Sequence, residues 1–181
     1  MKYFSVLLSF ALVACSSQSA PPQAKEIAIV ECATLSTSAG ANEMPTTELP
    51  CLTESGLTSK KYALNSINGP FVLNVWGSWC TSCIAELPFF VDLNNTKAVQ
   101  IVGLDVEEAQ ASDAITFAKK KAMAWPQIHD PNGATRGVFG MGVPVTWFVD
   151  KNGHVTFKKV GQIHSLAELK GLLKTHLGIS A

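Results

Sequence analysis

The stretch that decides the fold is Phe71-Val72-Leu73-Asn74-Val75-Trp76-Gly77-Ser78-Trp79-Cys80-Thr81-Ser82-Cys83. Its first half is a continuous run of β-branched, aromatic and aliphatic residues, which predicts a strand buried on both faces. The residues after Cys83 carry apolar side chains at helical spacing, so we expect a helix over residues 81–95. Cys80 would then lie at the start of that helix, where unpaired backbone N–H groups and the helix dipole favour a thiolate. The pattern predicts a redox-active dithiol.

The composition is that of a folded globular domain. The chain has 181 residues, of which 47% are hydrophobic and 15% are charged, enough for one domain with its own core. The formal net charge is zero, and the longest basic run is only Lys119-Lys120-Lys121. Nucleic-acid binding driven by counterion release is therefore not expected.

The N-terminus has the pattern of a lipoprotein signal peptide over residues 1–14. Lys2 precedes an apolar run that is too short to cross a bilayer as a mature helix. The run ends in Leu12-Val13-Ala14-Cys15, which resembles the lipobox of bacterial lipoproteins. That resemblance implies cleavage before Cys15 and two acyl chains on the mature N-terminus, the number needed for stable anchoring. An ordinary secretory signal with an incidental cysteine is the alternative.

Residues 15–26 are rich in Ser, Gln, Ala and Pro, which predicts a flexible tether. Residues 27–181 then form the domain, with an extension at its N-terminus. We expect this domain on the extracytoplasmic face of the cell membrane, held there by lipid.

The five cysteines divide by function. If Cys15 carries lipid, four remain, an even number that suits an oxidising compartment. Cys80 and Cys83 pair as the motif, so Cys32 and Cys51 are expected to form a structural disulfide worth roughly 3 kcal/mol. Two free thiols, or a second exchange pair that passes electrons to the dithiol, are the alternatives. Zinc is not expected, because the chain has no second Cys-x-x-Cys and no histidine pair at ligand spacing; no other cofactor is expected.

The remaining elements follow from periodicity and turn residues. Further strands are expected over residues 47–53, 99–106, 127–129, 145–149 and 155–159. Asp150-Lys151-Asn152-Gly153 makes the last two a hairpin. Helices are expected over residues 112–122 and 166–177, with helical turns at 62–67 and 135–139. This order predicts an α/β fold, a central mixed sheet flanked by helices on both faces.

Three motifs in this order resemble the thioredoxin superfamily over residues 47–177. Trp79-Cys80-Thr81-Ser82-Cys83 corresponds to its W-C-x-x-C motif. Gly142-Val143-Pro144-Val145-Thr146 corresponds to its cis-proline loop, and Lys159-Val160-Gly161 before a leucine-rich helix corresponds to its ending. The resemblance implies a thioredoxin-like fold and thiol–disulfide exchange.

Two further segments narrow the resemblance. The chain looks like the membrane-anchored TlpA/ResA-like disulfide reductases in two places. The first is residues 74–80 followed by Glu86-Leu87-Pro88, and the second is the insert Leu104-Asp105-Val106-Glu107-Glu108. The predicted lipid anchor agrees with that branch.

The resemblance also implies roles for individual residues. Cys80 would attack the substrate disulfide, and Cys83 would resolve the mixed disulfide from within. Pro144 would be cis and packed against the dithiol. Val143 would offer its backbone to a substrate strand, and Trp79 would shape the rim beside Cys80.

Deprotonation of Cys83 requires a base. Thioredoxin has a buried aspartate where this chain has Asn74, and an amide cannot take the proton. The TlpA/ResA-like resemblance implies Glu108 for this role, with Glu107 as a near-equal alternative. Glu86 is expected mainly as an exposed helix charge, and Trp76 as a core residue. No role is expected for the histidines, because surface or hairpin positions explain them; they are His129, His154, His164 and His176.

The leading hypothesis is an extracytoplasmic thiol–disulfide oxidoreductase, a monomer that exchanges disulfides with proteins and with a membrane-embedded electron donor or acceptor. The resemblance favours a reductase, for instance one that keeps the haem-attachment cysteines of cytochrome c reduced. An oxidase in the folding of secreted proteins is the main alternative. A peroxidase is less favoured, because Leu73 and Gly77 stand where peroxiredoxins have Pro and Thr. A copper-binding module is also less favoured, because its motif is Cys-x3-Cys with a distant histidine.

Overall fold

A computed structural model of the chain describes residues 27–140 and 142–181. The expected signal peptide, the tether and Cys15 lie outside the described residues. Within these two ranges, no helix has both the length and the apolar character needed to cross a membrane.

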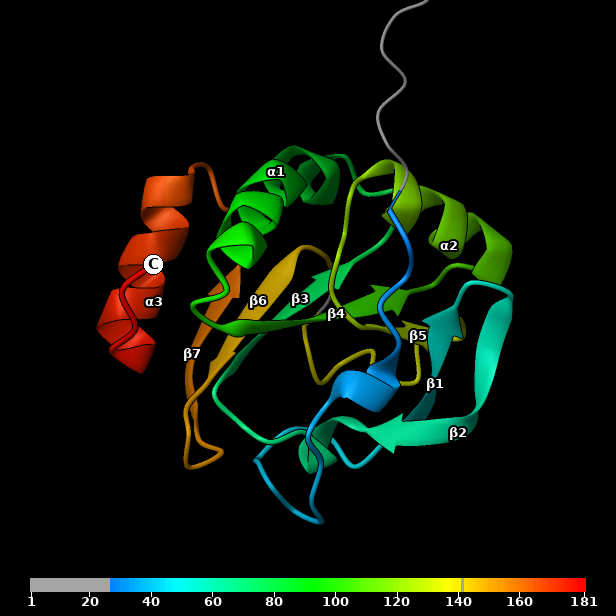
Figure 1. Ribbon diagram of the computed structural model, residues 1–181, viewed down its shortest axis with the longest axis horizontal. Helices are drawn as coiled ribbons and strands as arrows, with labels where there is room; N and C mark the ends of the chain where they lie inside the picture. The colour runs from blue at the N-terminus through cyan, green and yellow to red at the C-terminus, as the bar shows by residue number, and fades with distance from the viewer. Residues whose placement is uncertain (1–26, 141) are drawn as a thin grey trace, which may run out of the picture.

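A mixed seven-stranded sheet forms the centre of the domain, in the order β2-β1-β5-β4-β3-β6-β7 (Figure 1). The strands are β1 (Glu48–Thr53), β2 (Gly56–Ala63), β3 (Phe71–Trp76), β4 (Gln100–Val106), β5 (Gln127–Asp130), β6 (Val145–Val149) and β7 (Val155–Val160). Strands β3, β4 and β5 are parallel, and the other pairings are antiparallel. All six residues of β3 are buried, which confirms the prediction from its apolar run.

The three α-helices pack on one face of the sheet. They are α1 (Thr81–Thr96), α2 (Ala111–Lys120) and α3 (Leu166–Leu177), and all three contribute to the same core cluster. The connections β3-α1-β4 and β4-α2-β5 both step the same way across the sheet. Because such crossovers are right-handed, both helices must lie on the same side. In Figure 1 they lie above the strands.

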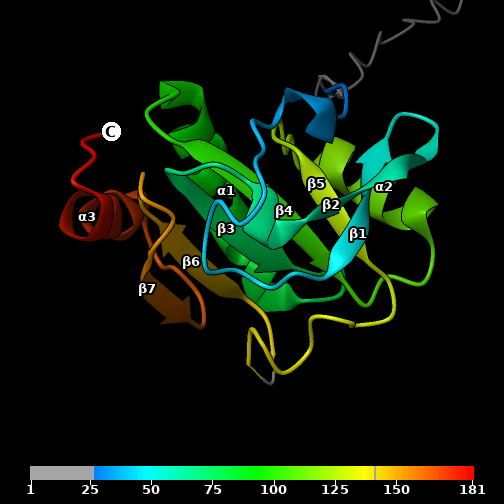
Figure 2. The ribbon, with the colours of Figure 1, turned by 90° about the horizontal axis from the view of Figure 1, so that it is seen from below.

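The N-terminal extension covers the opposite face. Its two short 3-10 helices are η1 (Cys32–Thr34) and η2 (Leu64–Ser66). Leu35, Met44 and Ile67 of this segment join the second core cluster, together with the inward side chains of β3, β4 and β6. Figure 2 shows the blue and cyan segment crossing in front of the sheet. Helices were expected on both faces. On this face, the described part of the chain contributes only the two 3-10 helices.

Two local predictions differ from the structure. Strand β2 was not expected, and the helical turn expected at residues 62–67 is the end of β2 followed by η2. Strand β2 is an edge strand whose exposed residues include Lys60 and Lys61; exposed lysines protect sheet edges but hide the strand pattern. The turn expected at residues 135–139 is present as non-helical turns over residues 134–138.

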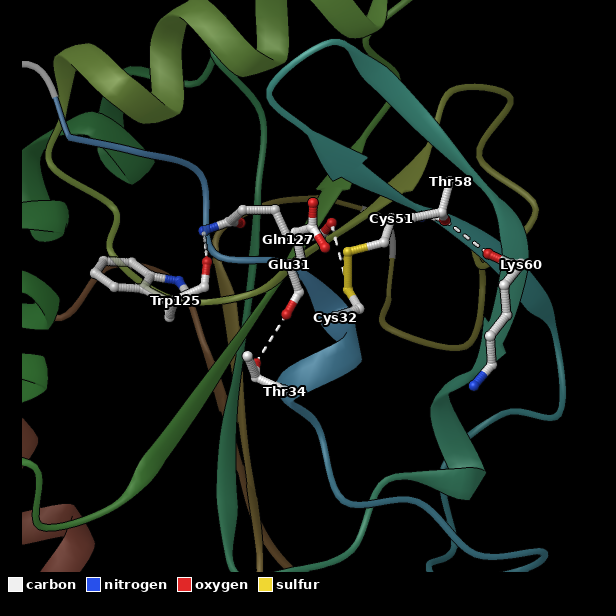
Figure 3. Close-up of a disulfide and its surroundings, with 8 residues drawn as sticks. All are labelled: Glu31, Cys32, Thr34, Cys51, Thr58, Lys60, Trp125 and Gln127. Atoms are coloured by element: carbon white, nitrogen blue, oxygen red, sulfur yellow. Dashed lines mark hydrogen bonds between the residues drawn. A yellow bond between two sulfur atoms is a disulfide. The ribbon is translucent and has the colours of Figure 1, made fainter.

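A disulfide joins Cys32 to Cys51 and fixes the extension to strand β1 (Figure 3). Both cysteines are fully buried. Cys51 pairs with Ile128 across the β1–β5 ladder, and the Sγ atom of Cys32 lies 3.9 Å from the carbonyl oxygen of Gln127. Since neither sulfur is open to attack by a partner's thiol, this geometry favours a structural bridge over a second exchange pair.

Removal of this disulfide should destabilise the whole domain. The bridge spans 19 residues, so the Cys32→Ala/Cys51→Ala variant should lose about 3 kcal/mol of unfolding free energy in urea titrations. The control is the Cys83→Ala variant compared under oxidising and reducing conditions, because its Cys80–Cys83 disulfide cannot form while the Cys32–Cys51 bridge can still open and close. An unchanged urea midpoint in both comparisons would contradict a stabilising role.

Candidate active site

The dithiol lies where β3 passes into α1. Residues 77–79 connect the strand to the helix, and Cys80 is the N-cap residue of α1. The two cysteines form a disulfide with 5.2 Å between their Cα atoms. The Sγ atom of Cys80 accepts a hydrogen bond from the Cys83 backbone N–H at 3.1 Å. This N–H would also stabilise a Cys80 thiolate after reduction.

The two sulfur-bearing residues differ in accessibility. Cys80 is 6% exposed and Cys83 only 1%. A partner can therefore reach Cys80 more easily, whereas Cys83 is covered. This asymmetry suits attack at Cys80 and resolution by Cys83.

The proline loop predicted at residues 142–146 has the expected backbone geometry. The Val143–Pro144 peptide bond is cis, and the Pro144 carbonyl accepts a hydrogen bond from the Gly161 N–H at 3.0 Å. Val143 packs against the core cluster that contains both cysteines. Trp79 is 54% exposed beside Cys80, so its side chain is available to a partner.

Glu86 is fully buried, so the expectation of an exposed helix charge is wrong. It lies one helical turn after Cys83, on the same side of α1. Its Oε1 atom accepts from the Asn74 side-chain amide at 3.0 Å, and its Oε2 atom accepts from the Ile163 N–H at 2.9 Å. Burial raises the pKa of Glu86 to about 7, although both hydrogen bonds act in the opposite direction.

The structure separates the two glutamates of the β4–α2 loop. The Oε1 atom of Glu108 accepts a hydrogen bond from the Ser78 N–H at 2.6 Å, in the loop that precedes Cys80. The carboxylate of Glu107 instead accepts from Arg136 Nε at 2.8 Å. Glu108 therefore contacts the dithiol loop, whereas Glu107 is engaged with the segment that follows β5.

His129 is buried and paired, so its expected surface position is wrong. Its Nδ1 atom lies 2.5 Å from Asp105 Oδ2, and both side chains are almost fully buried. Asp105 also lies beside Trp76 in the sheet register, at the end of β3. Burial raises the pKa of Asp105 to about 6, although the hydrogen bond with His129 acts to lower this pKa. Nothing local in the sequence signalled this pair, because the residues are 24 positions apart.

The buried carboxyl of Glu86 should make stability pH-dependent. Its folded pKa of about 7 exceeds its ordinary 4.5, so the folded state keeps a proton that the unfolded state releases. Stability must then fall as the pH rises, by about 2.5 kcal/mol between pH 5 and 8. Urea titrations at several pH values should show a loss of unfolding free energy between pH 5 and 8 that is about 2.5 kcal/mol smaller in the Glu86→Gln variant. Equal slopes in the two proteins would rule out a raised pKa.

Comparisons with known proteins find relatives of this chain in sequence and in fold. The sequence model of the AhpC/TSA family matches residues 41–158. The chain is 30% identical to thiol-disulfide oxidoreductase ResA of Bacillus thuringiensis over 132 residues, which is 70% of this chain and 75% of that protein. It is 27% identical to thiol:disulfide interchange protein DsbE of Xylella fastidiosa over 122 residues, 66% of this chain and 60% of that protein.

A solved structure shows the same fold. It is a secreted Mycobacterium tuberculosis disulfide oxidoreductase homologous to E. coli DsbE. The two superpose with a TM-score of 0.59 at 23% identity, covering 72% of this chain and 96% of that one. At this identity the match supports the thioredoxin-like fold alone.

Proposed function

Because this chain belongs to the AhpC/TSA family of the thioredoxin superfamily and is a thiol–disulfide oxidoreductase, we propose that it exchanges disulfides with extracytoplasmic proteins through Cys80 and Cys83, mainly as a reductase. The observation that carries this proposal is the Cys80–Cys83 disulfide at the start of α1. Cys80 is the more accessible of the two residues.

The proposed exchange takes place in two steps. The Cys80 thiolate attacks one sulfur of the substrate disulfide, so that a mixed disulfide forms and the other substrate sulfur leaves as a thiolate. The Cys83 thiolate then attacks Cys80, which releases the second substrate sulfur. Two electrons pass from the dithiol to the substrate, and the two dithiol protons end on the released thiols.

We infer that the Glu86 carboxylate accepts the proton of the Cys83 thiol. A carboxyl with a pKa of about 7 can accept and return a proton near neutral pH. Asn74 supports both states, because its amide N–H donates to the ionised carboxylate, and its unpartnered Oδ1 can accept from the protonated form after an amide flip. Glu108 holds Ser78 and stays the second candidate.

The carboxyls around the dithiol support the reductase direction. Glu86 and Glu108 place negative charge near the site when ionised, and a nearby like charge disfavours a thiolate. A reduced form that is less stabilised corresponds to a lower reduction potential, and so to a stronger reductant. The N–H group of Cys83 acts the other way, because it stabilises a Cys80 thiolate. Oxidative folding of secreted proteins remains the alternative function.

The proposed location rests on the N-terminus. Residues 1–14 would act as the signal peptide, Cys15 would carry the lipid, and residues 15–26 would tether a monomeric domain to the membrane surface. A membrane-embedded protein would then supply or accept electrons. The haem-attachment cysteines of cytochrome c are the substrate class that we propose for the reductase.

Two measurements test the proposal. Equilibration with dithiothreitol or glutathione buffers should place the Cys80–Cys83 potential below roughly −200 mV, nearer to thioredoxin than to DsbA. The Cys83→Ala variant should retain partners as mixed disulfides on Cys80. A potential near −120 mV, with unfolded secreted proteins in the trap, would reverse the direction. A dithiol that exchanges with no disulfide would refute the function itself.

A further inference from the structure

We propose that the buried Asp105–His129 pair is a redox-linked proton site for the dithiol. The pair takes up a proton when reduction leaves a thiolate on Cys80, and it releases that proton when the thiolate is consumed. It acts on Cys80 through its charge, so its two members are positioning residues. The inference rests on the proposed function, and it adds a proton that the assigned role of Glu86 does not account for.

The pair lies on the face of the sheet that carries the three α-helices. Asp105 is four residues after Ile101, which belongs to the core cluster on that face, and side chains alternate along a strand. His129 is opposite Asp105 in the β4–β5 register, and Trp76 is opposite it in the β3–β4 register. Trp76 belongs to the same core cluster as both active-site cysteines. The pair is therefore on the same side of the sheet as the dithiol.

Along the strands, the pair lies between two hydrogen bonds that connect neighbouring elements. On the side away from the dithiol, Trp76 Nε1 donates to Gln127 Oε1 at 3.0 Å. On the dithiol side, the Oε1 atom of Glu108 accepts from the Ser78 N–H at 2.6 Å. Glu108 follows the aspartate of the pair by three residues, and Ser78 precedes Cys80 by two. This second bond connects the strand that carries the pair to the loop that ends at Cys80.

The pair is shielded from water and incompletely hydrogen-bonded. Asp105 is fully buried and His129 is 2% exposed. The Asp105 Oδ2 atom lies 2.5 Å from His129 Nδ1, whereas the buried Oδ1 atom has no hydrogen-bond partner among the described residues. An ionised carboxylate with one bare oxygen is poorly stabilised away from water. The pair therefore holds a proton more tightly than an exposed aspartate does.

Most of the charges around Asp105 favour its protonated form. Burial raises the pKa of Asp105 to about 6, the carboxyls of Glu108 and Asp130 add to this increase, and His129 opposes it. The buried side chains of α2 are all apolar. Glu86, the buried carboxyl of α1, bonds instead to β3 and to the segment before α3. The pair as a whole is neutral with one shared proton and negative without it.

Reduction of the dithiol adds a negative charge on the same side of the sheet. A reducing dithiol gives two electrons, becomes a disulfide and releases two protons. The Cys80–Cys83 bond breaks, one proton makes Cys83 a thiol, and Cys80 is left as a thiolate. This charge raises the proton affinity of the pair, which takes the second proton. When Cys80 attacks a substrate disulfide, the charge leaves on the substrate thiolate and the pair returns its proton.

The first test follows the His129 ring by NMR in the full chain, oxidised and reduced, from pH 5 to 9. The ring resonance is identified by its loss in His129→Gln, and it reports the pair because the ring contacts Asp105. Reduction should increase the proton affinity of the pair at least about fivefold, the low end for coupled sites. His154, which is 64% exposed on the β6–β7 turn, should titrate alike in both states.

The second test measures the same coupling from the thiol. In Cys83→Ala, only Cys80 of the dithiol can react with iodoacetamide. Adding Asp105→Asn removes the buried charge with little change in size, so alkylation at about pH 7.5 should be at least about fivefold faster. Linkage requires this factor to match the one from the first test. Asp92→Asn, the same change at an exposed position of α1, should leave the rate unchanged.

The two tests distinguish this coupling from a purely structural role. A pair that titrates identically in both redox states, with an alkylation rate that Asp105→Asn does not change, would overturn the inference. The first test compares redox states of the unmodified chain, so it holds even if Asp105→Asn does not fold.

Glutathione disulfide separates this inference from the proposed function. A reduced chain that exchanges with neither glutathione disulfide nor any protein disulfide would refute the function. A chain that exchanges with glutathione disulfide but shows no coupling in either test would refute only the redox-linked proton site.

Discussion

Cys80→Ser is expected to lower the rate of thiol–disulfide exchange by at least about 10³-fold, because a hydroxyl cannot replace the attacking thiolate. Cys83 cannot compensate, since it is 1% exposed. The measurement is the second-order rate constant for reduction of a peptide disulfide by stoichiometric reduced protein.

The controls for this prediction are two further variants. Cys83→Ala should still attack, and should then accumulate as the mixed disulfide. Ser82→Ala, between the two cysteines, should keep its rate within a few-fold. Full exchange activity in Cys80→Ser would refute the assignment of Cys80, and with it the mechanism proposed for this site.

Glu86→Gln is expected to slow resolution of the mixed disulfide by about 10²-fold at neutral pH, the usual contribution of a general base. In the unmodified protein the rate should rise with pH through about 7, where the Glu86 carboxyl ionises. In the variant this rise should be absent. Stopped-flow measurement of resolution from a preformed mixed disulfide, between pH 5 and 9, isolates the step.

Glu108→Gln is the matched control, because it also converts a buried carboxyl to an amide near the dithiol. It should loosen the Ser78 loop and change the rate, but keep the rise near pH 7. If the rise disappears in Glu108→Gln and persists in Glu86→Gln, Glu108 is the proton acceptor instead.

The reaction type could be predicted from local sequence. The run over residues 71–76 is long and uniformly apolar, so only a buried strand fits it. Cys80 and Cys83 are three residues apart, and a helix start alone brings their sulfurs together. The hairpin of β6 and β7 likewise follows from its turn residues. Each of these features depends on neighbours in the chain, which is why periodicity and spacing reveal them.

The surroundings of the dithiol were decided by contacts between distant segments. Glu86 is buried against a distant segment, since its Oε2 atom accepts a hydrogen bond from the N–H of Ile163, 77 residues away. Asp105 meets His129 only because β4 and β5 are parallel neighbours. The extension covers a face of the sheet that a helix was expected to cover.

The sequence by itself therefore determined the fold family, the reactive pair and the helix start that activates it, since each is encoded within one or two elements. Only the tertiary structure decided that Glu86 and Glu108 are buried and which groups their carboxyls contact. The physical reason is that burial, which sets a pKa, depends on what the rest of the chain packs against a residue.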